Sequence, residues 1–257
     1  MGTIHRRYIF LRQKPRNDPY RVLILLALLV VALFVLREFR SGAIEAPFTA
    51  TATPTRTVNS YEVEAETYFQ VGDLNRAIES YRQAIQVQPE NAQLYAEMAR
   101  IQTYSSSLLT SVDDRRQRLQ DALATIDKGV ELAPDDSTVH AVRAFVLDWN
   151  SSALIAGENS TTVLLQAEQE AVTAINLDNQ NTLALVYYAE ILVDQQKWGQ
   201  AEQYIQQAMD RDTSLMDVHR VMGYVLESTQ RYSEAIAEYQ KALEIAPNMP
   251  LLWLQIG

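Results

Sequence analysis

The sequence predicts an all-α protein: a solenoid of stacked helix-turn-helix repeats behind one apolar segment near the amino terminus. Three observations predict this fold. A pattern of about 34 residues recurs along most of the chain, small and apolar residues within it fall at helical spacing, and fifteen consecutive apolar residues precede it. At 257 residues and 47% hydrophobic content, the chain is long enough to bury a sizeable core.

Charge divides the chain into two parts. The first 40 residues contain eight Lys and Arg against two acids, whereas the remaining 217 contain 14 against 30. The acidic part repels phosphates, so we expect no nucleic acid binding and instead protein partners with basic or apolar segments. The chain has no cysteine, which excludes disulfides, thiolate metal sites and a thiol nucleophile.

Residues 22–36 read VLILLALLVVALFVL and predict a single transmembrane helix at 21–37. As a helix the run spans roughly 22 Å, short of the ~30 Å hydrocarbon core. Arg21 and Arg37 can extend this span because their charged ends reach the membrane surface. A basic tail, residues 1–20, precedes the helix.

Six Lys and Arg residues precede the helix and three follow within twenty residues, so we expect a cytoplasmic amino terminus and an extracytoplasmic body. The expected location is the inner membrane of a bacterium. A cleaved signal peptide is the alternative, with small residues at Ser41 and Ala43. Charges at Arg37, Glu38 and Arg40 favour the anchor. The Ala-, Thr- and Pro-containing segment 38–57 is interpreted as a linker.

The repeats are clearest in two distant segments, GDLNRAIESYRQAIQVQPENA from Gly72 and QRYSEAIAEYQKALEIAPNMP from Gln230. In the first, Ala77, Tyr81 and Ala84 lie four and three residues apart, and the second has the same series. This spacing places them on one stripe of a helix, where alanines allow close approach of a neighbour. A proline then ends each unit.

A preceding helix with Tyr61, Ala65 and Tyr68 completes the first unit, and the whole pattern resembles the tetratricopeptide repeat. The resemblance covers nearly everything after Val58 and implies two helices per unit. The predicted units of the solenoid, 58–257, are 58–91, 92–136, 137–181, 182–215, 216–249 and the start of a sixth at 250–257.

The second and third units are each eleven residues too long, near 104–114 and 150–161. Both insertions lie at the turn within a unit, so they should project from the same edge of the solenoid, as a lip, a binding element or surface decoration. Because the sequence stops within a sixth first helix, we expect a further repeat or domain beyond Gly257.

Nothing in the sequence indicates catalysis. His140 and His219 occupy a position that packs between helices in the resembled family, and no HExxH pair or cysteine is present to bind zinc. The glycines form no phosphate-binding loop. Asp113-Asp114 and Asp135-Asp136 are interpreted as helix caps. We therefore expect that the protein is not an enzyme and that it binds no metal and no cofactor.

The resemblance implies a concave groove lined by the first helices of successive units, which would bind a peptide or helix of a partner protein. The chain would then be a membrane-anchored interaction scaffold or assembly factor. Carried over position by position, the groove residues are Glu62, Glu66, Phe69, Arg100, Tyr104, Phe145, Asp148, Trp149, Glu190, Asp194, Arg220, Tyr224 and Glu227.

Two alternatives stay open. The repeats could be the recognition arm of a larger enzyme whose catalytic domain lies beyond residue 257, as the abrupt end suggests. They could also be a self-association module. The sequence does not decide between these functions.

Overall fold

The computed structural model describes residues 19–41 and 57–257, which fall into two separate units. The first contains one helix, α1 (Pro19–Ser41), whose apolar side chains from Val22 to Leu36 are exposed. Its 23 residues span about 34 Å, enough to cross a ~30 Å hydrocarbon core. In the described part of the chain it is the one helix long and apolar enough to do so. The basic tail and most of the linker lie outside the described residues.

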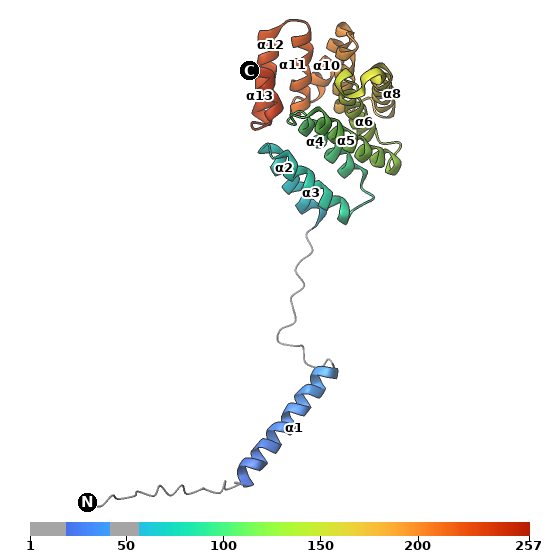
Figure 1. Ribbon diagram of the computed structural model, residues 1–257. Helices are drawn as coiled ribbons and strands as arrows, with labels where there is room; N and C mark the ends of the chain where they lie inside the picture. Colours follow the sequence, from blue (N-terminus) through green and yellow to red (C-terminus); the bar gives the residue numbers. More distant parts are fainter. Residues whose placement is uncertain (1–18, 42–56) are drawn as a thin grey trace, which may run out of the picture. The chain divides into compact units, whose positions relative to one another are not determined.

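The described secondary structure of the second unit is helical, and consecutive helices are arranged as antiparallel pairs (Figure 1). This confirms the all-α solenoid predicted from the repeats. The helices are α2 (Val58–Gln70), α3 (Leu74–Val87), α4 (Ala92–Ser106), α5 (Val112–Leu132), α6 (Ser137–Asn150), α7 (Ala153–Ala156), α8 (Ser160–Leu177), α9 (Thr182–Asp194), α10 (Trp198–Arg211), α11 (Met216–Ser228), α12 (Tyr232–Ile245) and α13 (Pro250–Ile256).

Short polar side chains cap several helix starts. The carboxylate of Asp136 accepts a hydrogen bond from the backbone N–H of Val139 at 3.0 Å, and Ser111 caps α5 through the N–H of Asp114 at 3.4 Å. Asp113 and Asp114 lie in the first turn of α5, where the free N–H groups favour negative charge. The aspartate pairs thus stand at helix starts, as the sequence predicts.

The two helices of each pair have different places in the solenoid. First helices α4, α6, α9 and α11 pack side by side in an inner layer, and the second helices cover them from outside. Small residues make this contact close. A Cβ added to Gly223 on α11 would lie 2.5 Å from the ring of Tyr239 on α12, so a methyl group would displace the ring.

The two insertions take the form of lengthened helices and one short helix. The first forms a turn and extends α5 to 21 residues. The second forms α7 and a 3₁₀ turn at Gly157–Asn159 before the 18-residue α8. Arg116 joins them, because its guanidinium donates to the carbonyl oxygens of Ile155 and Leu154, both at 3.3 Å. The inserted segments are therefore direct neighbours.

The solenoid is wound tightly enough for its first repeat to touch the turn after α12. The Asn248 side-chain amide donates to the carbonyl oxygen of Gln70 at 3.3 Å. Gly72, at φ +78°, lies so close that an added Cβ would stand 2.1 Å from the carbonyl oxygen of Asn248. The first repeat and the turn after α12 therefore touch, and the inner layer is not open along its whole length.

Candidate functional site

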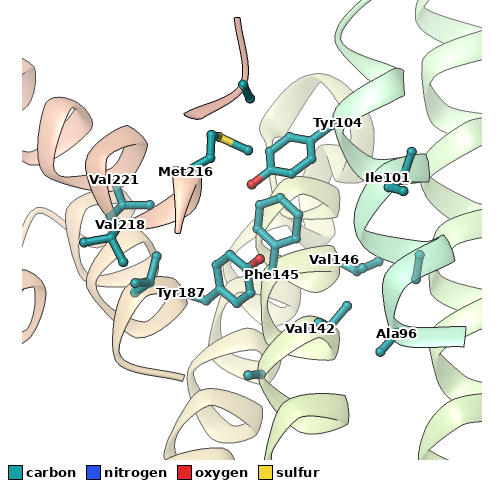
Figure 2. Packing of buried hydrophobic residues seen from close by; sticks show 14 of the residues in the cluster. Ala96, Ile101, Tyr104, Val142, Phe145, Val146, Tyr187, Met216, Val218 and Val221 are labelled. Atoms are coloured by element: carbon teal, nitrogen blue, oxygen red, sulfur yellow. The ribbon is translucent and has the colours of Figure 1, made fainter. Parts of the chain in front are cut away.

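Seven side chains from four inner helices fill the middle of the solenoid. We name them the axial cluster, consisting of Arg100 and Tyr104 on α4, Phe145 on α6, Tyr187 and Glu190 on α9, and Asp217 and Arg220 on α11. Figure 2 shows the rings of Tyr104, Phe145 and Tyr187 converging between α4 and the start of α11. In the middle of the inner face, the concave surface is therefore filled by the chain's own side chains.

Aromatic rings form the apolar part of the axial cluster. Phe145 and Tyr187 are stacked at 4.5 Å between ring centroids, and Phe145 and Tyr104 lie 5.2 Å apart. Trp149 meets both Phe145 and Tyr104 edge-on, at 5.5 and 5.9 Å. Such arrangements contribute about 0.5–1.5 kcal/mol per pair beyond the burial of area.

Two buried carboxylates balance two guanidinium groups in the same cluster. Arg220 donates from both terminal nitrogens to Glu190, at 2.8 and 2.6 Å, and lies over the rings of Tyr104 and Phe145. Burial lowers the pKa of Arg220, but the carboxylate of Glu190 outweighs it, so the pKa is raised and the side chain stays charged. The ion pair is thereby satisfied despite its burial.

Asp217 is the second carboxylate and the meeting point of several donors. It accepts hydrogen bonds from Arg100 at 3.0 Å, from Tyr187 at 3.2 Å and from the hydroxyl of Tyr104. Burial and the adjacent carboxylate of Asp217 raise the pKa values of both phenols, so they remain donors. These contacts connect α4, α9 and α11 across the inner layer.

An open groove of about 490 Å³ lies beside the axial cluster, between α2 and α4. Leu94 and Tyr81 form its buried floor, and Glu62, Glu66 and Glu97 line it. Burial and then Glu97 raise the pKa of Tyr81, which keeps its hydroxyl protonated. The groove thus combines an apolar floor with acidic walls.

Comparisons with protein families match two stretches of the repeat region. A model described as TPR repeat matches residues 65–102, and one described as tetratricopeptide repeat matches residues 189–250. Among solved structures, TTC0263, a thermophilic TPR protein of Thermus thermophilus, is 17% identical with a TM-score of 0.60. The match covers 78% of this chain and 97% of that one. The fold is a tetratricopeptide-type solenoid.

Two further solved structures are similar at lower TM-scores. PilW, a type IV pilus biogenesis factor, is 16% identical with a TM-score of 0.47 over 77% of this chain and 84% of that one. YrrB, described as a TPR protein with an unusual peptide-binding site, is 16% identical with a TM-score of 0.37 over 77% and 91%. A search of curated proteins found no match.

All but one of the predicted groove residues fall into three groups in this tetratricopeptide solenoid. Glu62 and Glu66 line the open groove, and Phe69 is buried beneath the guanidinium of Arg100 at 5.1 Å. A second group belongs to the axial cluster: Arg100, Tyr104, Phe145, Glu190 and Arg220. The third group, Asp148, Trp149, Asp194 and Tyr224, lines a cavity at the carboxyl-terminal ends of the inner helices, where Glu190 and Arg220 also contribute.

Glu227 does not line either space. It is exposed at the end of α11, where it accepts a hydrogen bond from the hydroxyl of Tyr239 at 2.7 Å. The structure therefore brings most of the predicted residues together around one axis but buries a large part of them. Their role in binding a partner stays a prediction.

The two histidines of the tetratricopeptide body bridge the helices of their own repeats. His140 places Nδ1 2.6 Å from Glu170 on α8, and His219 places Nδ1 2.7 Å from Glu238 on α12. The Nε2 atom of each faces a backbone carbonyl oxygen at the end of the preceding repeat. Both rings are buried, and each ring nitrogen lies within hydrogen-bond distance of an oxygen atom.

Tyr187 and Asp217 were not among the predicted site residues, although they hold the axial cluster together. Glu97 and Leu94 of the open groove were also missed. One signal was present, because Asp217 and Arg220 stand three residues apart in MDVHRVMGYVLES, a segment rich in apolar residues. Charged residues in such a helix usually have partners when they are buried.

Proposed function

We propose that this chain is a membrane-anchored scaffold or assembly factor that binds partner proteins through the open groove between α2 and α4. The tetratricopeptide-type fold suggests a protein interaction scaffold, and the groove is the observation that carries the proposal. Its floor is apolar, its walls are acidic, and it stays open where the middle of the concave face is filled.

The groove suits a partner segment with an apolar side chain and positive charge. Leu94 is buried in the floor of the groove, whereas Val63 at the rim is 60% exposed and can contact an apolar anchor. Glu62 and Glu66 stand one helical turn apart on α2 and attract Lys or Arg. The acidic balance of the body disfavours nucleic acid as the partner.

We further propose that α1 is a retained anchor in the inner membrane of a bacterium, with the repeats outside the cytoplasm. Its length, its exposed apolar surface and the excess of positive charge before it support this arrangement. In this role the solenoid presents its groove to subunits of a larger complex and catalyses no reaction itself.

Site-specific photo-crosslinking in native membranes tests the proposal. A photoreactive residue at Val63, on the groove rim, is expected to capture a partner that the same residue at Glu244, on the exposed face of α12, does not. The double variant Glu62→Lys with Glu66→Lys should lower that capture about tenfold or more.

The double variant Asp210→Lys with Glu244→Lys makes the same change of charge on exposed positions of the outer helices and serves as the control. If both double variants lower capture equally, general charge rather than the groove attracts the partner. Capture of the same proteins from both crosslinking positions would also contradict the proposal. Protease accessibility on intact cells, with α1 retained, checks the orientation.

A further inference from the structure

A cavity of about 290 Å³ lies at the carboxyl-terminal ends of α6 and α9, separate from the α2–α4 groove. Both insertions form its walls: α5 contributes Arg115 and Leu119, and α7 contributes Ile155. Leu251 and Gln255 of α13 complete it. Both insertions and α13, which the repeat pattern alone does not require, therefore meet at one partly open cavity.

Buried polar atoms without hydrogen-bond partners gather at this cavity. In the described part of the chain there are six such side-chain atoms, and four belong to residues that line it. They are Oδ1 of Asp148, Oε1 of Gln255, Nε of Arg115 and Nε of Arg220. Because a buried polar group without a partner is unfavourable, their concentration at one cavity favours a polar ligand there.

The charge of the lining is negative when all groups are ionised. Arg220 is neutralised by its two hydrogen bonds to Glu190. Arg115 donates to the carbonyl oxygen of Leu109 at 3.0 Å and keeps its charge, so three carboxyl groups face two guanidinium groups in the lining. Asp148, with 3% of its surface exposed, has no ion-pair partner among the described residues. Asp194, at the exposed rim, adds a third carboxyl group and accepts a hydrogen bond from Tyr224 at 2.5 Å.

Aromatic rings accompany these carboxyl groups. Trp149 and Tyr224 line the cavity, and the indole nitrogen of Trp149 donates to Glu190 at 3.2 Å, which fixes the ring. Carboxylates combined with aromatic surfaces bind organic cations, through charge and through the negative ring face. The apolar Leu119, Ile155 and Leu251 suit a short aliphatic stem.

We propose that this cavity binds a small organic cation, a primary ammonium or guanidinium group on an aliphatic stem, with Asp148 as its counter-ion. The cation is supplied either by a free amine or by a Lys or Arg side chain of a protein. This inference goes beyond the scaffold function, because the cavity and the α2–α4 groove share no lining residue.

Binding should be linked to a proton. Burial, followed by the neighbouring Asp194 and Glu190, raises the pKa of Asp148 well above its ordinary value, while Arg220 acts in the opposite direction. Without a cation beside it, the carboxyl group of Asp148 is therefore favoured in its protonated form. A cation favours the carboxylate, so its entry releases the proton from Asp148 to the buffer.

Calorimetry on the full chain in detergent, in amine-free buffers at mildly acidic pH, tests the proposal. The probes are cadaverine as the free amine, Nα-acetyl-lysine-N-methylamide as the side chain, and n-pentanol as the neutral analogue. Cadaverine or the capped lysine should bind with proton release, seen as a heat that depends on the ionisation enthalpy of the buffer. Binding of cadaverine alone identifies a free amine as the source, and binding of the capped lysine identifies a protein side chain.

Asp148→Asn keeps the shape of the side chain and should lower affinity about 30-fold or more, with loss of proton release. Ser152→Trp, at an exposed lining position, should block entry without altering the core. Asp210→Asn, on an exposed position of α10, is the matched control. Saturable binding of n-pentanol as tight as that of cadaverine, no binding of either amine, or an unchanged affinity in Asp148→Asn would overturn the proposal.

Discussion

Asp217 on α11 accepts a hydrogen bond from the guanidinium of Arg100 on α4 across 3.0 Å, although 117 residues separate them in sequence. Extended solenoids have contacts between neighbouring repeats, and each repeat is then stabilised by its neighbours. Here the second and fifth repeats also stabilise each other directly. We therefore expect the repeats to unfold with more cooperativity than an open array.

The contribution of this contact can be measured with Asp217→Asn. The substitution keeps the size of the side chain but removes the negative charge that accepts hydrogen bonds from Arg100 and two tyrosine hydroxyls. Asp217 is buried, with 3% of its surface exposed. We expect the free energy of unfolding to fall by about 3 kcal/mol, as when one partner of a buried ion pair is removed. Urea denaturation followed by circular dichroism measures it.

Asp113→Asn is the control for this change, because Asp113 pairs with Arg116 at the surface and its side chain is 90% exposed. Its effect should stay below about 1 kcal/mol. Equal losses in the two variants would mean that the cross-solenoid contact adds nothing to stability.

Closure of the solenoid at its first repeat depends on Gly72. Alanine at this position would adopt an unfavourable positive φ, costing about 1–2 kcal/mol, and its Cβ would meet the carbonyl oxygen of Asn248. We expect Gly72→Ala to lower the free energy of unfolding by at least that amount. It should also accelerate hydrogen exchange in the turn around Asn248.

Gly199→Ala provides the contrast, because beyond the backbone of its own helix α10 nothing lies within 4 Å of the added Cβ. That variant should gain up to about 1 kcal/mol from helix propensity and leave exchange near Asn248 unchanged. If Gly72→Ala left exchange in that turn unchanged as well, the contact would not hold the solenoid closed.

The sequence predicted the repeats because their cause is local. Ala77, Tyr81 and Ala84 fall on one helix stripe, and such a stripe packs on a helix nearby in sequence. The axial cluster could not be predicted in the same way. Whether Tyr104 reaches Asp217 depends on the rotation between repeats, summed over several of them, and small differences per repeat decide whether the concave face is open or filled.

The cavity at the carboxyl-terminal ends of α6 and α9 could not be predicted from the sequence either, although both insertions were recognised. Their common turn indicated a shared edge, but the lengths of α5 and α7 fix where Arg115 and Ile155 point. Asp148 was predicted to line a groove for a partner; its side chain is buried, and α9 packs against its helix α6. A pattern of surface positions on one helix gives no information on what a distant helix covers.

Whether α1 is a retained anchor or a cleaved signal peptide can be tested by following α1 in the mature protein. A retained anchor predicts a full-length protein that stays with membranes after alkaline carbonate extraction, and a soluble protein when residues 19–41 are deleted. Mass spectrometry of the intact protein measures the amino terminus. A mature chain starting close to Ser41 or Ala43 would show cleavage and contradict anchoring by α1.

The buried carboxyl group of Asp148 should make stability depend on pH. Burial raises its pKa in the folded state, with Asp194 and Glu190 of α9 acting in the same direction and Arg220 of α11 against it. The pKa of Asp194 is itself raised to about 6, first by desolvation, although part of its side chain is exposed. Both groups therefore bind protons more tightly in the folded chain than in the unfolded chain.

Their contribution is complete below the ordinary carboxyl pKa and is lost as pH rises through the folded-state values. In amine-free buffers, the free energy of unfolding of the wild type should therefore decrease from mildly acidic to alkaline pH. Asp148→Asn should decrease less, so that it becomes the more stable protein at the alkaline end. Asp212 has the opposite sign, because hydrogen bonds from Ser214 lower its pKa. The wild type should exceed Asp212→Asn in stability at neutral pH and lose that advantage on acidification. An unchanged pH slope in Asp148→Asn would show that Asp148 titrates as an ordinary carboxyl group.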